Sequence, residues 1–275
     1  MRTVFVAYAD NKMAYSLKRI GRQAENLKFF DKIKLYTPED LPDDVKEWDL
    51  MKYSYGGGYW AWKPYIIWQT LQEEPNGTIV FYVDAGCSLK KGFEWAWLAR
   101  LAKKYKTVFF EYKSEMSEWE KFGSVSSTIK FWTKKDALEY YDSFVGKPDW
   151  KEKNKIWGGC LIVTEKHNVI IKEWLNIMKN HPEIIIDPQK EDIQMSYFAQ
   201  HKHDQSLLVA LSSKYPNKCI VLPEFQESFG EDVSIFASRI RAKTFGNYLF
   251  DRIKYYIRKF LGQSNYNLIK KKIIK

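Results

Sequence analysis

Asp84 lies at the end of a hydrophobic run, Ile79–Val83, and is followed directly by Ala85 and Gly86. A short apolar run that ends in turn residues is typical of a buried strand. In open α/β sheets, ligands bind just beyond the carboxyl ends of the strands. The pattern therefore predicts that the Asp84 carboxylate faces a ligand at the edge of a sheet.

A second set of polar residues, His203, Asp204, Gln205 and Ser206, comes directly before an apolar run. It combines a metal-competent imidazole, a carboxylate and a carboxamide in consecutive positions. At the start of a helix these side chains would project toward the same edge as Asp84. Alternatively, Asp204 is only an N-cap or first-turn acid, which leaves His203 and Gln205 unexplained. Both interpretations stay open.

Three successive glycines, residues 56–58, precede Trp60, Trp62 and Lys63. Glycines allow the backbone to approach a ligand closely, tryptophans can stack on it, and a lysine can bind phosphate. The cluster is not a dinucleotide-binding fingerprint, because it follows a polar stretch rather than a strand. A tight turn that places the tryptophans in the core is the alternative.

Two weaker candidates lie near other predicted strands. Gly158 and Gly159 precede an apolar run and would let the backbone approach a sugar, although close packing between strands explains them equally well. Glu111 ends a strand of its own and is a spare acid.

The elements that must position these residues alternate between strands and helices. Apolar patterning predicts strands at 4–8, 33–36, 79–83, 107–111 and 157–163, and helices at 12–30, 64–71, 168–180 and 203–215. Alternation of this kind predicts an α/β fold with a mostly parallel sheet and helices on both faces.

Several protein classes are excluded by composition. Three scattered cysteines without a CxxC pair argue against a disulfide framework and favour a reducing cytoplasm. The apolar part of residues 1–8 is too short for a signal peptide and is predicted to be a strand. No apolar run approaches the roughly 20 residues that a membrane span needs.

The net charge of +10 is confined to the C-terminal part of the chain. Residues 239–275 contain eleven Lys and Arg against the single acid Asp251, which leaves 33 basic and 33 acidic residues in 1–238. A neutral body argues against nucleic acid as a partner, because a duplex footprint needs basic residues beside the site.

Within this basic tail, apolar residues recur at spacings of four and three, as on one face of a helix: Phe245, Leu249, Ile253, Ile257 and Phe260. A basic amphipathic helix is typical of membrane-surface binding. We therefore predict a catalytic domain at 1–238 and a tail at 239–275 that holds the protein at the inner face of an anionic membrane. Packing of the apolar face on the domain is the alternative.

Taken together, four stretches in order resemble a bacterial and viral group of glycosyltransferases that have a glycosyltransferase-A fold and are often encoded with capsule or lipopolysaccharide genes. The stretches are GYWAWKPYII at 58–67, FYVDAGC at 81–87, HDQS at 203–206 and FASRIR at 236–241. The resemblance covers roughly residues 1–241. It implies a nucleotide-sugar donor at the sheet edge and a glycan or lipid-linked acceptor, with surface polysaccharide as the product.

The resemblance also implies site residues. Those expected to bind the donor are Tyr8, Lys63, Asp84, Gly86, Gly158, Gly159, Arg239 and Arg241. Asp204 would contact a donor or acceptor hydroxyl, or act as the base if the reaction inverts, and Gln205 would orient a hydroxyl.

Asp84 and His203 are the expected ligands of a Mn²⁺ or Mg²⁺ ion. The usual Asp-x-Asp is Asp84-Ala85-Gly86 here, so the second acid is missing. Without an ion, Lys63, Arg239 and Arg241 would have to stabilise the departing diphosphate.

Two other classes would use a similar sheet edge. A sugar nucleotidyltransferase should carry a glycine-rich basic loop after the first strand, and residues 9–12, Ala-Asp-Asn-Lys, match it poorly. A non-catalytic carbohydrate-binding protein would explain the aromatic residues, but not acids and amides gathered at strand ends.

Overall fold

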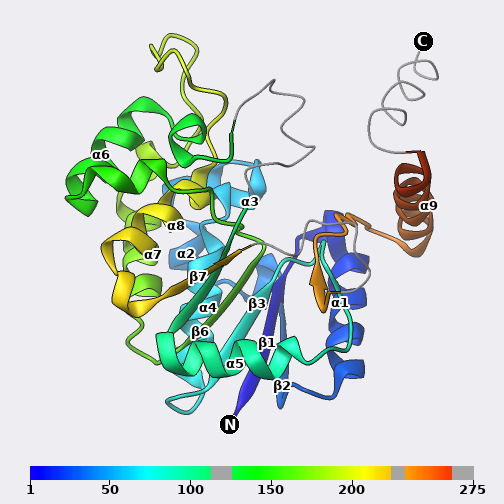
Figure 1. Cartoon of the computed structure of the whole chain (residues 1–275). Helices are drawn as coiled ribbons and strands as arrows, with labels where there is room; N and C mark the ends of the chain where they lie inside the picture. The colour runs from blue at the N-terminus through cyan, green and yellow to red at the C-terminus, as the bar shows by residue number, and fades with distance from the viewer. Residues whose placement is uncertain (113–125, 224–232, 262–275) are drawn as a thin grey trace, which may run out of the picture.

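The computed structural model describes residues 1–112, 126–223 and 233–261, without some side chains of the last helix. Its centre is a six-stranded sheet in the order β2-β1-β3-β6-β5-β7 (Figure 1). The strands are β1 Thr3–Tyr8, β2 Lys32–Tyr36, β3 Ile79–Val83, β5 Thr107–Glu111, β6 Cys160–Thr164 and β7 Ile220–Pro223. Only β6 runs antiparallel to its neighbours, so the predicted α/β fold with a mostly parallel sheet is confirmed.

Helices cover both faces of this sheet. They are α1 Ala14–Leu27, α2 Asp43–Lys46, α3 Gly56–Tyr59, α4 Trp62–Glu73, α5 Glu94–Tyr105, α6 Lys135–Val145, α7 Val169–Asn180, α8 His203–Lys214 and α9 Phe245–Leu261. Side chains alternate along β3, so Phe81 meets Trp95 of α5, whereas Tyr82 meets Trp62 of α4 on the opposite face. β3 is buried over its whole length, as expected of a central strand covered on both faces.

Strand β6 differs from its prediction in position and direction. The apolar run at 157–163 becomes a strand only from Cys160, and it pairs antiparallel with β3. The start of β6 therefore lies where β3 ends, and the Asp84 amide donates to the Gly159 carbonyl at 2.9 Å. This reversal brings Gly158 and Gly159 to the carboxyl edge of the parallel strands.

Helix boundaries differ slightly from those predicted, for local reasons. Helix α1 begins after a short 3₁₀ turn, Asn11–Met13, and ends at Leu27 because Lys28 adopts a left-handed conformation with φ of 53°. Pro64 is the third residue of α4 rather than the first. A proline is tolerated there because first-turn amides have no acceptor within the helix.

The end of the body is a strap, residues 238–242, that lies across the turn after Asp84. It follows β8 (Ile235–Phe236), which pairs antiparallel with β4 (Ser88–Leu89). The Ile240 amide donates to the Gly86 carbonyl at 3.0 Å, and Ser16 of α1 donates to the Ile240 carbonyl at 2.9 Å. These contacts place residues up to Ala242 with the body, four residues beyond the predicted boundary.

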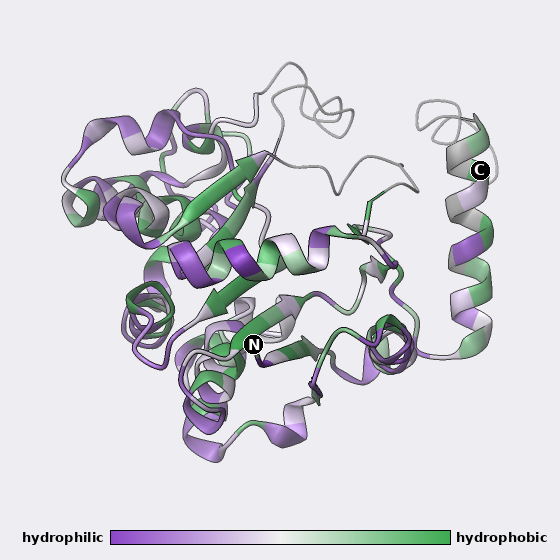
Figure 2. Ribbon diagram, turned by 60° about the horizontal axis from the view of Figure 1, so that its bottom comes forward, coloured by the Kyte–Doolittle hydropathy of each residue, from purple (hydrophilic) through white to green (hydrophobic). Residues whose placement is uncertain are grey.

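Helix α9 lies beside α1 and projects away from the body (Figures 1 and 2). Tyr15 of α1 meets the rings of Phe245 and Tyr248 in its first turns. The five residues of the predicted apolar stripe are each 40% or more exposed. Beyond the contact of Phe245 with Tyr15, this face is therefore largely exposed in the described residues. Among the described residues, no helix is long and apolar enough to cross a membrane.

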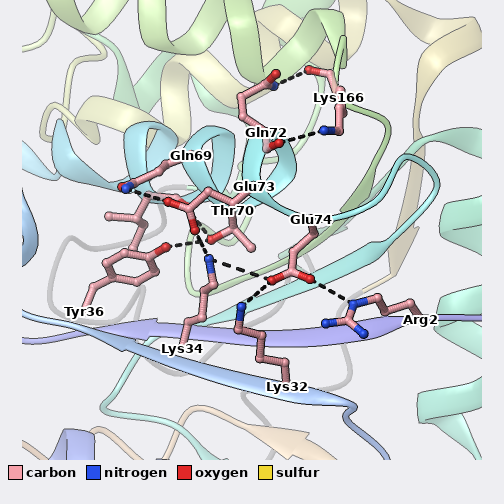
Figure 3. Close-up of polar contacts among 11 residues, drawn as sticks. Arg2, Lys32, Lys34, Tyr36, Gln69, Thr70, Gln72, Glu73, Glu74 and Lys166 are labelled. Carbon is pink, nitrogen blue, oxygen red and sulfur yellow. Dashed lines mark hydrogen bonds and ion pairs between the residues drawn. The ribbon is translucent and has the colours of Figure 1, made fainter.

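A polar cluster fixes the other end of α4 at the amino-terminal edge of the sheet (Figure 3). The buried carboxylate of Glu74 pairs with Arg2 at 2.8 Å and with Lys32 at 2.7 Å. Lys34 pairs with Glu73 and lies 4.0 Å from Glu74. Arg2 directly precedes β1, and Lys32 and Lys34 lie in β2. This cluster therefore connects α4 to the sheet.

Candidate functional site

The centre of the site is the ammonium group of Lys63, in the first turn of α4. It donates to the Gly158 carbonyl at 2.9 Å and to Asp204 Oδ2 at 3.0 Å. Asp84 Oδ1 lies 3.7 Å away. One buried cation thus joins the end of β3, the start of β6 and the first turn of α8.

The charges around Lys63 do not balance. Burial alone lowers the pKa of Lys63, but the carboxylates of Asp204 and Asp84 outweigh it and raise that pKa above its ordinary value. Lys63 therefore stays charged, and two carboxylates share one ammonium. The side chains of Lys63 and Asp204 are 3% and 6% exposed, whereas that of Asp84 is 40% exposed. The uncompensated negative charge lies at the accessible end of the cluster.

The carboxylate of Asp84 is held by Tyr82, which lies two residues earlier and points to the same side of the sheet. The Tyr82 hydroxyl donates to Asp84 Oδ1. Burial, together with the charge of Asp84, raises the pKa of Tyr82 well above its ordinary value, so the phenol keeps its proton. Within the part of the chain that the structure describes, Oδ1 takes both polar contacts and no hydrogen bond reaches Oδ2. That oxygen can accept a hydrogen bond or bind a cation.

Gly158, before β6, makes room for this cluster. A Cβ at Gly158 would lie 3.1 Å from Asp204 Oδ2 and 3.5 Å from the Lys63 ammonium, which would crowd the ion pair. The Gly159 carbonyl accepts the Asp84 amide. Gly158 thus allows its backbone to approach the ion pair closely, and the predicted approach to a sugar stays a prediction.

These contacts also revise the role of Lys63. We expected a cation that binds phosphate, and the structure encloses the side chain, with its donors directed to Gly158, Asp204 and Asp84. Lys63 is placed to orient two carboxylates rather than to reach out to a ligand.

His203 lies next to this cluster, with its two ring nitrogens in different situations. Nδ1 donates to the Ile185 carbonyl at 2.8 Å, which leaves Nε2 as an acceptor. Nε2 is buried, has no hydrogen-bond partner among the described residues, and lies 3.6 Å from Asp187 Oδ1. Burial lowers the pKa of His203, which favours the neutral ring. A lone pair that faces a carboxylate is an arrangement suited to a cation.

The turn at the glycine run positions three aromatic side chains against His203, and we call this set, Tyr55, Tyr59 and Trp60, the aromatic wall. All five residues from Gly56 to Trp60 have positive φ, so the chain makes one left-handed turn. A Cβ at Gly58 would lie 2.9 Å from the Met51 Cα, so a larger residue does not fit. Tyr59 and Trp60 adopt the same conformation at a cost of about 1 kcal/mol or more each.

The rings carried by this turn surround the imidazole. The ring centroids of Tyr55, Tyr59 and Trp60 lie 5.5, 5.0 and 5.6 Å from that of His203. The Tyr59 hydroxyl donates to Asp187 Oδ2 at 3.2 Å. The strained turn therefore holds both His203 and its carboxylate neighbour.

Two other predicted site residues, Tyr8 and Gln205, have different surroundings from each other. Tyr8 stacks on Trp62 with centroids 3.8 Å apart, so that face of its ring is covered. Gln205 Oε1 is buried without a hydrogen-bond partner among the described residues. Because an unsatisfied buried oxygen is costly, it is suited to accept a hydrogen bond from a ligand hydroxyl.

Arg239 and Arg241 reach the site on the strap. Their backbone is held at Gly86, whose carbonyl accepts the Ile240 amide at 3.0 Å and the Ser238 hydroxyl at 2.9 Å. Both side chains are exposed, and Arg239 has a left-handed φ of 54°. Burial and then Asp187 raise the pKa of Tyr55, whereas Arg241 lowers it, so Arg241 lies toward the aromatic wall.

The structure thus brings most of the predicted residues together, with two exceptions, and it adds one residue that was not predicted. No ion pair within 4.0 Å joins His203 to Asp84 in the described ranges, and the carboxylate that His203 faces is Asp187. Asp187 was missed because the Asp-Pro dipeptide that follows Ile186 indicates only a turn. Glu111 is half-buried at the end of β5 and interacts with Asn154 rather than with this cluster.

The residues fit a cation only in part. No group of three or more His, Cys, Asp or Glu side chains arranged for a metal occurs in the described residues. The orphaned Nε2 of His203, the Asp187 carboxylate and the negative charge at Asp84 nevertheless suit a cation that takes its remaining ligands from a substrate.

Comparisons with known proteins give structural similarity only. No protein-family profile matches the sequence, and no curated protein matches it. A viral glycosyltransferase involved in glycosylation of the major capsid of PBCV-1 is 10% identical, with 83% of this chain and 85% of that chain covered at a TM-score of 0.46.

Two further structures are similar to the same extent. The galactosyltransferase LgtC, in complex with donor and acceptor sugar analogues, is 13% identical over 91% of this chain and 94% of its own, with a TM-score of 0.42. Mouse xyloside xylosyltransferase 1 is 10% identical over 81% of this chain and 85% of its own, also at 0.42.

Proposed function

We propose that this protein is a glycosyltransferase that moves a sugar from a nucleoside-diphosphate donor to a hydroxyl of a glycan or lipid-linked acceptor in surface polysaccharide synthesis. The observation that carries the proposal is the pair of carboxylates, Asp84 and Asp204, held by the buried Lys63 at the carboxyl edge of the sheet. The four ordered sequence stretches that resemble glycosyltransferases support the same function.

In this reaction the acceptor oxygen bonds to the anomeric carbon while the bond from that carbon to the diphosphate breaks. The leaving diphosphate takes the electron pair, so positive groups beside it lower the barrier. Arg239 and Arg241 supply guanidinium groups for this purpose next to the Asp84 turn, residues 84–87. Asp84 would bind the ribose or a cation through its free oxygen, Oδ2.

Asp204 and Gln205 would position the sugar. Asp204 is fixed through Oδ2 by Lys63 and would accept a hydrogen bond from a donor or acceptor hydroxyl. If the reaction inverts, the same carboxylate would take the acceptor proton. Gln205 Oε1, which lacks a partner among the described residues, would orient a second hydroxyl.

We further propose that the donor binds with Mn²⁺ or Mg²⁺. His203 Nε2 and the carboxylates of Asp187 and Asp84 would hold the ion, with diphosphate oxygens and water as further ligands. A bound cation would neutralise charge on the diphosphate. The orphaned ring nitrogen of His203 is the observation that favours it.

Helix α9 is proposed to bind an anionic membrane at its cytoplasmic side, near a lipid-linked acceptor. Its exposed apolar stripe would enter the interface, and each Lys or Arg near an anionic leaflet adds about 1 kcal/mol. Truncation after Thr244 should abolish flotation with phosphatidylserine vesicles and leave turnover on a soluble acceptor unchanged. Vesicle binding by the truncated protein would exclude α9 as the anchor.

The proposed reaction is tested by incubating the protein with a panel of nucleotide sugars, with and without Mn²⁺, and measuring released nucleotide by mass spectrometry. We expect release from one donor class. If no donor turns over and no nucleotide shifts the melting temperature, the protein is not a glycosyltransferase.

A further inference from the structure

Arg19, in the middle of α1, is a buried cation that sequence analysis did not single out. Its guanidinium donates to the Ala85 carbonyl at 3.0 Å and to the Cys87 carbonyl at 2.5 Å. The same group donates to the Ser88 hydroxyl at 3.1 Å. Arg19 therefore fixes the segment that follows Asp84 through hydrogen bonds.

The Asp84 turn is otherwise held weakly within itself. The Cys87 amide donates to the Asp84 carbonyl at 2.9 Å, which closes a four-residue turn. The carbonyls of Ala85 and Cys87 both accept from Nη2 of Arg19, while Nη1 donates to the Ser88 hydroxyl, so the two terminal nitrogens of one planar guanidinium hold three groups. A lysine ammonium has a single nitrogen and lacks this arrangement.

The same hydrogen-bond network reaches the strap. Ser88 and Ser238 share a hydrogen bond of 2.7 Å between their hydroxyls, and Ser238 also donates to the Gly86 carbonyl. One turn before Arg19 on α1, Ser16 donates to Ile240 and accepts from the Ala242 amide at 2.8 Å. Helix α1 thus holds both the Asp84 turn and the strap.

The electrostatic situation of Arg19 is unusual for a purely structural residue. No carboxylate lies within 4.0 Å of its guanidinium in the described residues, so two backbone carbonyls, the Ser88 hydroxyl and the Gln23 side-chain oxygen compensate the buried charge. Its Nε has no hydrogen-bond partner within the same residues. A buried positive charge behind the Asp84 turn also favours an anion on the outer side of that turn.

We propose that Arg19 is a positioning residue, which fixes the Asp84 turn and the strap in one register so that Asp84, Arg239 and Arg241 meet the same nucleoside diphosphate. This inference rests on the proposed function for the identity of the ligand. The geometric part, that Arg19 orders the two segments, is independent of it.

The geometric part is tested by hydrogen–deuterium exchange of the ligand-free full chain. In Arg19→Gln, amides of the Asp84 turn and the strap, those of Cys87 and Ile240 above all, should exchange at least tenfold faster. Amides of β6 should be unchanged. Arg22→Gln is the matched control, because Arg22 is an exposed arginine on the same helix.

The functional part is tested by binding of UDP, GDP, CDP and dTDP with Mn²⁺. For whichever nucleotide binds the wild type, Arg19→Gln should weaken the dissociation constant at least tenfold, Arg19→Lys should recover part of the loss, and Arg22→Gln should bind normally. If the wild type binds none of them, the proposed function fails, while the exchange data still decide whether Arg19 orders the turn.

A second variant covers the case in which Arg19→Gln does not fold. Ser238→Ala removes the hydroxyl bonded to Gly86 and should accelerate exchange of the Ile240 amide alone. Unchanged exchange at Cys87 and Ile240 in Arg19→Gln, unchanged exchange at Ile240 in Ser238→Ala, or acceleration spread evenly over all strands in either variant would overturn the proposal.

Discussion

The two ends of helix α4 each bury a charged group, but with opposite arrangements. At the first turn, one cation, Lys63, faces two carboxylates, Asp204 and Asp84. At the last, the carboxylate of Glu74 faces Arg2 and Lys32, with Lys34 beyond (Figure 3). The first cluster lies at the carboxyl edge of the sheet and the second at the amino-terminal edge.

The difference shows how a structural ion cluster is told from a functional one. Around Glu74, positive groups reach the carboxylate from neighbouring strands and satisfy it. Around Lys63, the carboxylates outnumber the cation, and one of them keeps an accessible oxygen. An unbalanced charge at the edge where α/β sheets bind ligands indicates a binding site. A buried carboxylate that is fully paired with cations at the opposite edge, as Glu74 is, indicates stability.

The largest expected effect is a loss of activity on mutation near the first turn of α4, which distinguishes that end of the helix from the Glu74 end. Asp84→Asn keeps the shape of the side chain but removes the charge that we propose binds the donor, so turnover should fall by about 10² or more. The melting temperature should change little, because the carboxylate is partly solvated. Turnover assays and thermal unfolding check this, and near-normal turnover would place the site elsewhere.

Lys63→Met should affect both properties. Removal of the ammonium leaves Asp204 buried beside an unpaired carbonyl, which should cost about 3 kcal/mol of unfolding free energy. Activity per folded molecule should also fall, since Asp204 and Asp84 lose their common support. Denaturant unfolding together with turnover provides the check. Wild-type stability would mean that Asp204 rearranges to reach water.

Glu74→Gln should affect stability alone. The loss of its hydrogen-bonded ion pairs should cost about 2 kcal/mol, while turnover per folded molecule should match the wild type. Denaturant unfolding and the same turnover assay measure this. A loss of activity equal to that of Asp84→Asn would remove the distinction between the two ends.

The pH dependence of stability sharpens the same comparison. Burial alone raises the pKa of Glu74, but the hydrogen bonds and charges of Lys32 and Arg2 lower it below its ordinary value. The folded protein therefore binds this proton more weakly than the unfolded chain. The stabilisation is present above the unfolded pKa of about 4.3 and is lost as the pH falls further. Glu74→Gln should flatten this loss in unfolding curves measured between pH 6 and 3.

Local signals in the sequence predicted the elements and the residue types of the site. Asp84 could be placed at a strand end because an apolar run and a glycine flank it, and the start of α8 followed from its apolar run. The direction of β6 could not be predicted, because an apolar strand has the same pattern in either direction.

The roles of single residues depended on partners distant in the chain. Lys63 was selected as a phosphate ligand, but its contacts with Gly158 and Asp204 lie 95 and 141 residues away and enclose it. Arg19 and Asp187 carried no local signal, because their partners meet them only in the folded chain. A tight turn was one of two interpretations of the glycine run; its left-handed form and the lack of room for a side chain at Gly58 beside Met51 appear only in the folded chain.

The most direct test of the site is a mass-spectrometric screen of nucleotide sugars on the wild type, Asp84→Asn and Glu74→Gln in parallel. We expect one donor to be consumed by the wild type and by folded Glu74→Gln, and to survive with Asp84→Asn. Equal consumption by Asp84→Asn, or no consumption and no nucleotide binding by the wild type, would contradict the assignment of this edge as a glycosyltransferase site.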